Sequence, residues 1–238
     1  MRRPAAVTVA VAGLLLACSS AGGDDTLTVL AAASLTDAFT DLAARFEDDH
    51  PDVEVQVSFA GSQQLVAQIS EGAEADVVAT ADEESMRSLG KMGATFATNR
   101  LSIVVEPANP LGIDGLDDLA DDDLALVLAA PRVPAGRYAE AVLEGAGVDA
   151  HPKSFEENVK AVVTRVALGE ADAGIAYVTD VAAAGGAVDG VDIPENENIV
   201  AAYPIAALGG DPLGEGFVDL VLSATGRAVL AEHGFAAP

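Results

Sequence analysis

The fold is decided by residues 27–37, which read LTVLAAASLTD. The short apolar run at 27–32 is typical of a buried parallel strand. Apolar residues then recur at helical spacing from Leu35 to Phe46. A strand that passes directly into a helix is the repeating unit of α/β proteins, so this stretch predicts that fold class.

The same alternation continues along the chain. Further strands are expected at 53–57, 77–80, 101–105, 124–129 and 174–177, and further helices near 65–69, 137–143, 159–166 and 216–232. We therefore expect two α/β lobes with mainly parallel sheets and a ligand cleft between them. The expected first lobe comprises 26–103 plus 204–238, and the second comprises 104–203.

The N-terminus predicts export. Arg2 and Arg3 precede an apolar stretch at 5–16 that is too short to span a membrane and is typical of a signal peptide. The stretch ends in LLAC at 15–18, which resembles the lipobox of bacterial lipoproteins. We expect residues 1–17 to be removed, Cys18 to carry lipid, and 18–25 to form a tether on the outer face of the cell membrane. The alternative is a plain secretory signal.

Charge and cysteine content exclude several classes of function. The formal net charge is −26, with 38 acidic and 12 basic residues, which argues against a basic surface that binds nucleic acid. Loss of the signal peptide would remove two arginines and no acid, giving −28. Cys18 is the only cysteine, so neither a disulfide within the chain nor a cysteine metal site is possible.

Candidate ligand-binding residues stand where strands pass into helices, because ligands of open α/β sheets bind beyond the carboxyl ends of strands. Ser34 follows the first strand, with Asp37 three residues later, and Ser62 follows Gly61 after the second strand. Ser34 is also explained as an ordinary helix cap, and Gly61 as a residue that simply makes the turn before Ser62. The alternative is that the hydroxyls and first helical N–H groups bind an anion.

Two later junctions and a tyrosine extend this set. Pro134 leaves the N–H of Ala135 free at an expected helix start, and the segment at 154–160 has the pattern of a helix N-terminus that opens with Ser154. Tyr177 ends a buried strand, and its hydroxyl can donate a hydrogen bond. Together these residues predict a neutral cleft rich in hydrogen-bond donors.

Five motifs occur in a specific order: AASLT at 32–36, FAGS at 59–62, GAEADV at 72–77, VPAG at 133–136 and GIAY at 174–177. In content and spacing the chain resembles, over about residues 26–237, the molybdate-binding component of bacterial molybdate ABC importers, which has the type II periplasmic binding protein fold.

The resemblance implies an oxyanion, molybdate and also tungstate, enclosed between two lobes and delivered to an ABC permease by a monomer. It implies side-chain donors Ser34, Ser62 and Tyr177, main-chain donors at Ala135 and Val159, no direct ligand to the metal and no cofactor. Gln63 and Gln64 stand where many family members have further hydroxyls.

Two alternatives stay open. One is a binding protein of the same fold for another oxyanion, such as sulfate. The other is a hydrolase that uses Ser34 or Ser62 as nucleophile, which would need a histidine beside the serine. His50, His151 and His233 all lie outside the motifs, and no nucleophile elbow, phosphate-binding loop or metal-ligand spacing is present. We therefore expect a binding protein and not an enzyme.

Overall fold

In the computed structural model, which describes residues 25–238, β1 (Asp25–Ala32) lies between two parallel neighbours. These are β2 (Val53–Ala60) and β3 (Val77–Ala79). Alternate residues of β1 face opposite sides of the sheet. Leu27 and Val29 pack in the core that includes α1 and α7, whereas Leu30 packs with residues of α2 and α3.

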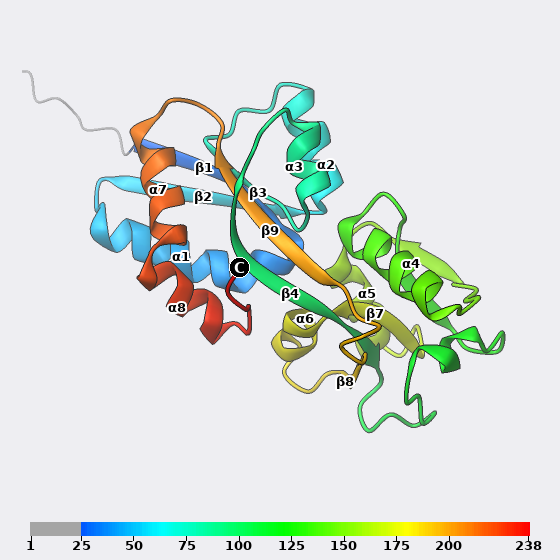
Figure 1. The fold of residues 1–238 in the computed structure, drawn as a ribbon. Helices are drawn as coiled ribbons and strands as arrows, with labels where there is room; N and C mark the ends of the chain where they lie inside the picture. Colours follow the sequence, from blue (N-terminus) through cyan, green and yellow to red (C-terminus); the bar gives the residue numbers. More distant parts are fainter. Residues whose placement is uncertain (1–24) are drawn as a thin grey trace, which may run out of the picture.

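Five α-helices therefore cover the two faces of the first lobe (Figure 1). They are α1 (Thr36–Asp49), α2 (Ser62–Ser70), α3 (Glu83–Ser88), α7 (Pro212–Leu222) and α8 (Ala224–Glu232). The short 3-10 helix η1 (Ala33–Leu35) joins β1 to α1. The core includes Phe217, whose ring packs against those of Phe39 and Phe46.

The second lobe repeats this plan around β5 (Leu126–Ala129), which lies between the parallel strands β6 (Ser154–Glu156) and β7 (Ala173–Tyr177). Its remaining elements are α4 (Pro134–Ala146), α5 (Val159–Ala167), α6 (Val178–Ala183), the 3-10 helix η2 (Leu116–Ala120) and β8 (Asp189–Asp192).

Two long strands, β4 (Ala94–Val105) and β9 (Val200–Ala207), connect the lobes (Figure 1). The first half of β4 pairs with β9 in the sheet of the first lobe, and the second half, from Leu101, pairs with β7 and β8 in the second lobe. The lobe boundaries expected at 103/104 and 203/204 both fall within these two strands.

The α/β class is confirmed, but the sheet is mixed. Every antiparallel pairing involves β4 or β9, and every pairing among the other strands is parallel. Sequence analysis did not predict β9, because its residues VAAYPIAA include a proline and four alanines that favour strands weakly.

Three local predictions were wrong. Ser154 does not start a helix: it opens β6, and α5 begins at Val159 behind Asn158, whose side chain accepts from Ala161 N. Ser34 is not a capping residue, because it lies inside η1 and caps no N–H group. The helix expected at 216–232 is two helices, α7 and α8, separated at Ser223, whose hydroxyl caps α8.

The signal peptide, Cys18 and most of the tether lie outside the described residues. Within 25–238, none of the helices combines the length and the apolar character needed to cross a bilayer.

Candidate functional site

The six parallel strands of the two lobes all end at one cavity, which we call the interlobe cavity. Each lobe contributes three strand ends: Ser34 follows β1, Ser62 follows β2, Ala81 follows β3, Ala135 follows β5, Val159 follows β6 and Tyr177 ends β7. The structure thus brings together all five residues that the sequence singled out. Their role in binding stays a prediction.

The interlobe cavity is small and uncharged. Its volume is only about 10 Å³. Twelve residues line it, and none of them is acidic or basic. A ligand here would contact both lobes at once and would meet only neutral groups.

Two serine hydroxyls line the cavity, and each is already hydrogen-bonded to another group of the protein. Ser34 Oγ lies 3.1 Å from Tyr203 Oη, and Ser62 Oγ accepts from the backbone N–H of Ala81 at 3.1 Å. Both serines are buried. Because the Ser62 oxygen already accepts a hydrogen bond, its own hydrogen is available to a ligand.

Tyr177 supplies a third hydroxyl. Its Oη is buried and has no hydrogen-bond partner in the part of the chain that the structure describes. Burial is the main reason that the pKa of Tyr177 lies well above its usual value, so the hydroxyl keeps its hydrogen at neutral pH. An unsatisfied buried hydroxyl costs free energy, which a ligand that accepts its hydrogen bond would recover.

Two helix N-termini add main-chain donors. Ala135 is the second residue of α4, after Pro134, and Val159 is the first residue of α5. The first N–H groups of a helix have no partner within the helix and carry partial positive charge. Gly136 lets α4 approach the preceding strand, because a Cβ there would lie 2.2 Å from the carbonyl oxygen of Ala130.

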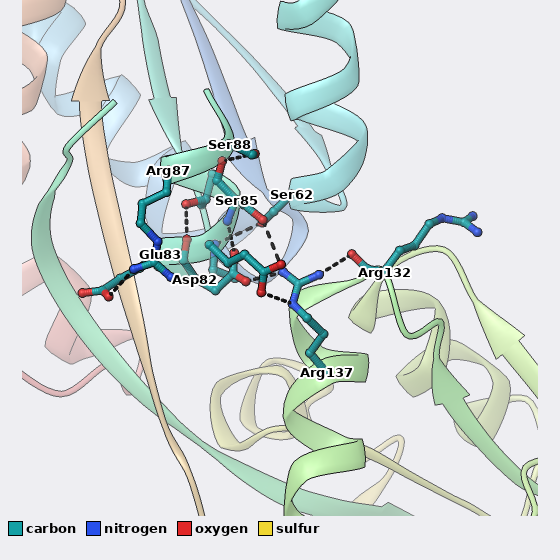
Figure 2. A network of polar contacts seen from close by, with 11 residues as sticks. Ser62, Asp82, Glu83, Ser85, Arg87, Ser88, Arg132 and Arg137 are labelled. Atoms are coloured by element: carbon teal, nitrogen blue, oxygen red, sulfur yellow. Dashed lines mark hydrogen bonds and ion pairs between the residues drawn. The ribbon is translucent and has the colours of Figure 1, made fainter. Parts of the chain in front are cut away.

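A partly buried ion pair joins the lobes beside this cavity. Arg137 of α4 reaches across to Asp82, the capping residue of α3 (Figure 2). Arg137 Nε also lies 3.3 Å from Glu84 Oε2. The Asp82 side chain is only 6% exposed. Asp82 follows Ala81, whose N–H holds Ser62, so the ion pair and the Ser62 hydroxyl are positioned by adjacent residues.

Further contacts between the lobes lie at the rim. Gln63 Nε2 donates to the carbonyl oxygen of Glu157 at 2.9 Å, and Gln64 Nε2 donates to the Glu157 carboxylate at 3.2 Å. Lys160 of α5 lies 3.4 Å from Asp37 of α1. The two glutamines thus contact the opposite lobe and do not line the interlobe cavity.

Asp180 lies three residues after Tyr177 and lines a neighbouring groove that also reaches Ser34. Both carboxylate oxygens are buried without a hydrogen-bond partner among residues 25–238. Burial raises the pKa of Asp180 to about 7, although Lys160 opposes the shift. The side chain is therefore largely neutral below pH 7, which limits repulsion of an anion beside Tyr177.

No histidine accompanies either serine in the described chain. His50 stacks on Phe46, His151 contacts Asp122, and His233 Nε2 lies 2.8 Å from Asp41 Oδ2. His233 lines the groove that reaches Ser34, but the only hydrogen-bond partner of Ser34 Oγ in the described residues is Tyr203. Among residues 25–238, neither serine hydroxyl thus has the hydrogen bond to histidine that a serine hydrolase uses.

Comparisons with known proteins assign the family. The model of the family "Bacterial extracellular solute-binding protein" matches residues 27–236. The chain belongs to this family. It is 38% identical over 225 residues to the molybdate-binding protein ModA of Mycobacterium bovis, covering 91% of this chain and 86% of that protein.

Solved structures of solute-binding proteins have the same fold. The periplasmic molybdate-binding protein of Azotobacter vinelandii aligns with a TM-score of 0.73 at 23% identity, covering 89% of this chain and 99% of that chain. The sulfate-binding protein SubI of Mycobacterium tuberculosis aligns with a TM-score of 0.78 at 18% identity, covering 90% and 87%. This solute-binding protein therefore has close structural counterparts among proteins named for different oxyanions.

The residues that hold the site residues in place carry no local signal in the sequence. Tyr203, which lies 3.1 Å from Ser34 Oγ, and Asn99, which lies 3.5 Å from Tyr203 Oη, come from the two strands that connect the lobes, and the sequence pattern at neither position indicated these contacts. The ion pair of Arg137 was not predicted either, because its partner Asp82 lies 55 residues away. Their common signal, burial of a polar side chain, is visible only in three dimensions.

The pKa of Asp180 predicts how stability depends on pH. Burial raises the pKa of Asp180 from its usual value of 3.8 to about 7 in the folded state, so stability is lost progressively as the pH rises from about 4 to about 7. Asp180→Asn removes this loss, so its melting temperature relative to wild type should increase between pH 5 and pH 8 in the absence of ligand. The control is Asp117→Asn, at an exposed position, whose melting temperature relative to wild type should show no such trend with pH. A difference between Asp180→Asn and wild type that stays constant from pH 5 to pH 8 would contradict the raised pKa of Asp180.

Proposed function

We propose that this solute-binding protein captures molybdate, and also tungstate, outside the cytoplasm and delivers it to an ABC permease. The observation that supports this most directly is the donor set of the interlobe cavity: Ser34, Ser62, Tyr177 and the N-termini of α4 and α5. The 38% identical relative carries the name of a molybdate-binding protein, which favours this oxyanion over others.

The chemistry of the donor set favours a fully deprotonated anion. Molybdate, tungstate and sulfate are tetrahedral dianions at neutral pH that only accept hydrogen bonds. Monohydrogen phosphate carries a proton that needs an acceptor, and an unpaired buried polar group costs about 1–3 kcal/mol. A site built from hydroxyl hydrogens and helix N–H groups satisfies the first set and penalises the second.

The hydrogen-bond donors must bind the anion without a positively charged side chain in the cavity. The chain has a net charge of −26, so its long-range field repels an anion. Ionic screening weakens that field at distances beyond about 10 Å at 0.1 M salt. At the cavity itself, partial charges of the helix N-termini act at short range, where they outweigh distant carboxylates.

Closure of the lobes would complete the site and mark the loaded state for a permease. Contacts of Arg137, Gln63 and Lys160 with the opposite lobe stabilise the closed arrangement. A ligand that contacts both lobes shifts the equilibrium toward this form because it binds the closed state better. We propose that lipid on Cys18 keeps the monomeric protein near the permease.

Isothermal titration of the chain from Ser19 with four anions tests the proposal. Protein freed of bound anion should bind one molybdate or one tungstate tightly, sulfate much more weakly and hydrogen phosphate not measurably. Preferred binding of sulfate would assign the protein to another oxyanion, and absence of heat with all four would overturn the proposal.

Ser62→Ala should weaken molybdate binding by about 10- to 150-fold, since a hydrogen bond to a charged group contributes about 1.5–3 kcal/mol. The matched control is Ser88→Ala, whose hydroxyl donates to the carbonyl of Ser85 and does not line the cavity. Equal affinities for Ser62→Ala and wild type would remove Ser62 from the site.

Arg137→Ala should weaken molybdate binding by about 10-fold or more, because the closed form would then bury Asp82 without its partner. Arg132→Ala is the control: its side chain is 64% exposed and lies 3.8 Å from Glu157, a surface pair worth about 0–1 kcal/mol. Titration of both variants should separate them clearly. If they bind alike, Arg137 does not stabilise the closed state.

A further inference from the structure

Ser34 is held from behind by a buried chain of hydrogen bonds along the strands that connect the lobes. Tyr203 of β9 places its Oη 3.1 Å from Ser34 Oγ and 3.5 Å from Nδ2 of Asn99 in β4. Asn99 Nδ2 also donates to Thr179 Oγ1 at 2.8 Å. All four side chains are buried. This series of hydrogen bonds thus extends from Ser34, which lines the cavity in the first lobe, to α6 of the second lobe.

The direction of these hydrogen bonds follows from Asn99. Its Oδ1 accepts from the backbone N–H of Arg100 at 2.9 Å, so the amide is oriented with Nδ2 toward Thr179 and Tyr203. An amide NH₂ group only donates, so Tyr203 Oη accepts from it. Between the two hydroxyls the more acidic phenol is the better donor, so we assign its hydrogen to the bond with Ser34 Oγ.

Ser34 Oγ therefore accepts, and its own hydrogen is left for the interlobe cavity. We infer that Tyr203 is a positioning residue that fixes the Ser34 hydroxyl as a donor and so makes the cavity select oxyanions that carry no proton. This inference rests on the proposed function, because it concerns the same ligand.

Of the three hydroxyls that line the cavity, Ser34 is the one whose orientation is set by another side chain, so its selection against protonated anions can be tested by substitution. Ser62 Oγ is held by a backbone N–H, which no substitution of a side chain removes directly, and the Tyr177 hydroxyl has no partner among the described residues. Without the Tyr203 hydroxyl, Ser34 could turn and accept a hydrogen bond from a protonated ligand. The cavity would then tolerate an anion such as monohydrogen arsenate.

Tyr203→Phe is a conservative test of this role. The ring packs edge-on against Phe96, Tyr177 and Phe235, and phenylalanine preserves these contacts. Asn99 keeps its hydrogen bond to Thr179. The matched control is Tyr138→Phe, since Tyr138 lies in α4, does not line the interlobe cavity and is the only other tyrosine besides Tyr177.

Titration with molybdate and with arsenate at pH 8, where arsenate is a dianion that retains one proton, measures the effect. Tyr203→Phe should weaken molybdate binding by about 3- to 10-fold, as expected for one neutral hydrogen bond. Arsenate binding should weaken less or improve, so the ratio of the two affinities falls. A purely structural role would weaken both ligands alike. Tyr138→Phe should leave affinities and ratio unchanged.

A double-mutant cycle with Ser34→Ala shows whether Tyr203 acts through Ser34. Tyr203→Phe should have no effect on molybdate affinity when Ser34 is already alanine. An unchanged ratio in the single variant, or the same loss with and without Ser34, would overturn the inference. Failure of the wild-type protein to bind any oxyanion would instead overturn the proposed function. Melting temperatures without ligand identify any variant that has not folded.

Discussion

At the proposed site a doubly charged anion has to be held by hydrogen-bond donors alone, because none of the residues of 25–238 that line the cavity between the lobes is positively charged. This constraint explains the architecture around it. Six parallel strands end at the cavity, and the turns and helices that follow them direct hydroxyls and N–H groups into it. Asp180, a buried carboxyl in the neighbouring groove that reaches Ser34, has a pKa raised by burial to about 7, so it is readily protonated beside an anion. An acidic protein can in this way bind an anion at a neutral site.

The direction in which each serine hydroxyl donates depends on the group that hydrogen-bonds to its oxygen. Ser62 is held by the N–H of Ala81, next to the Asp82–Arg137 ion pair between the lobes, whereas Ser34 is held by Tyr203 from a connecting strand. Each serine is therefore held by a group whose position depends on how the two lobes are arranged: the Ala81 N–H beside the ion pair for Ser62, and Tyr203 of the connecting strand β9 for Ser34. Closure and selection of the ligand would then be parts of one event, since a misplaced lobe would disturb the groups that orient the donors.

The sequence alone predicted the α/β class and the junctions at which Ser34, Ser62, Ala135, Val159 and Tyr177 stand, because strand-to-helix transitions are written in local patterns. It did not predict β9, whose alanines and proline are poor strand formers, and it misread Ser154 because a serine before acidic residues looks like a helix start. Tyr203 could not be found locally at all: it lies 169 residues from Ser34, and only the paired strands β4 and β9 bring the two hydroxyls together.

A crystal structure of the protein with molybdate, with the metal located by its anomalous scattering, tests the central claim most directly. The account predicts a single molybdenum peak in the interlobe cavity, with the oxygens of the anion accepting hydrogen bonds from Ser34, Ser62, Tyr177 and the N–H groups of Ala135 and Val159. A peak outside this cavity, or an anion paired there with a lysine or arginine side chain, would contradict it.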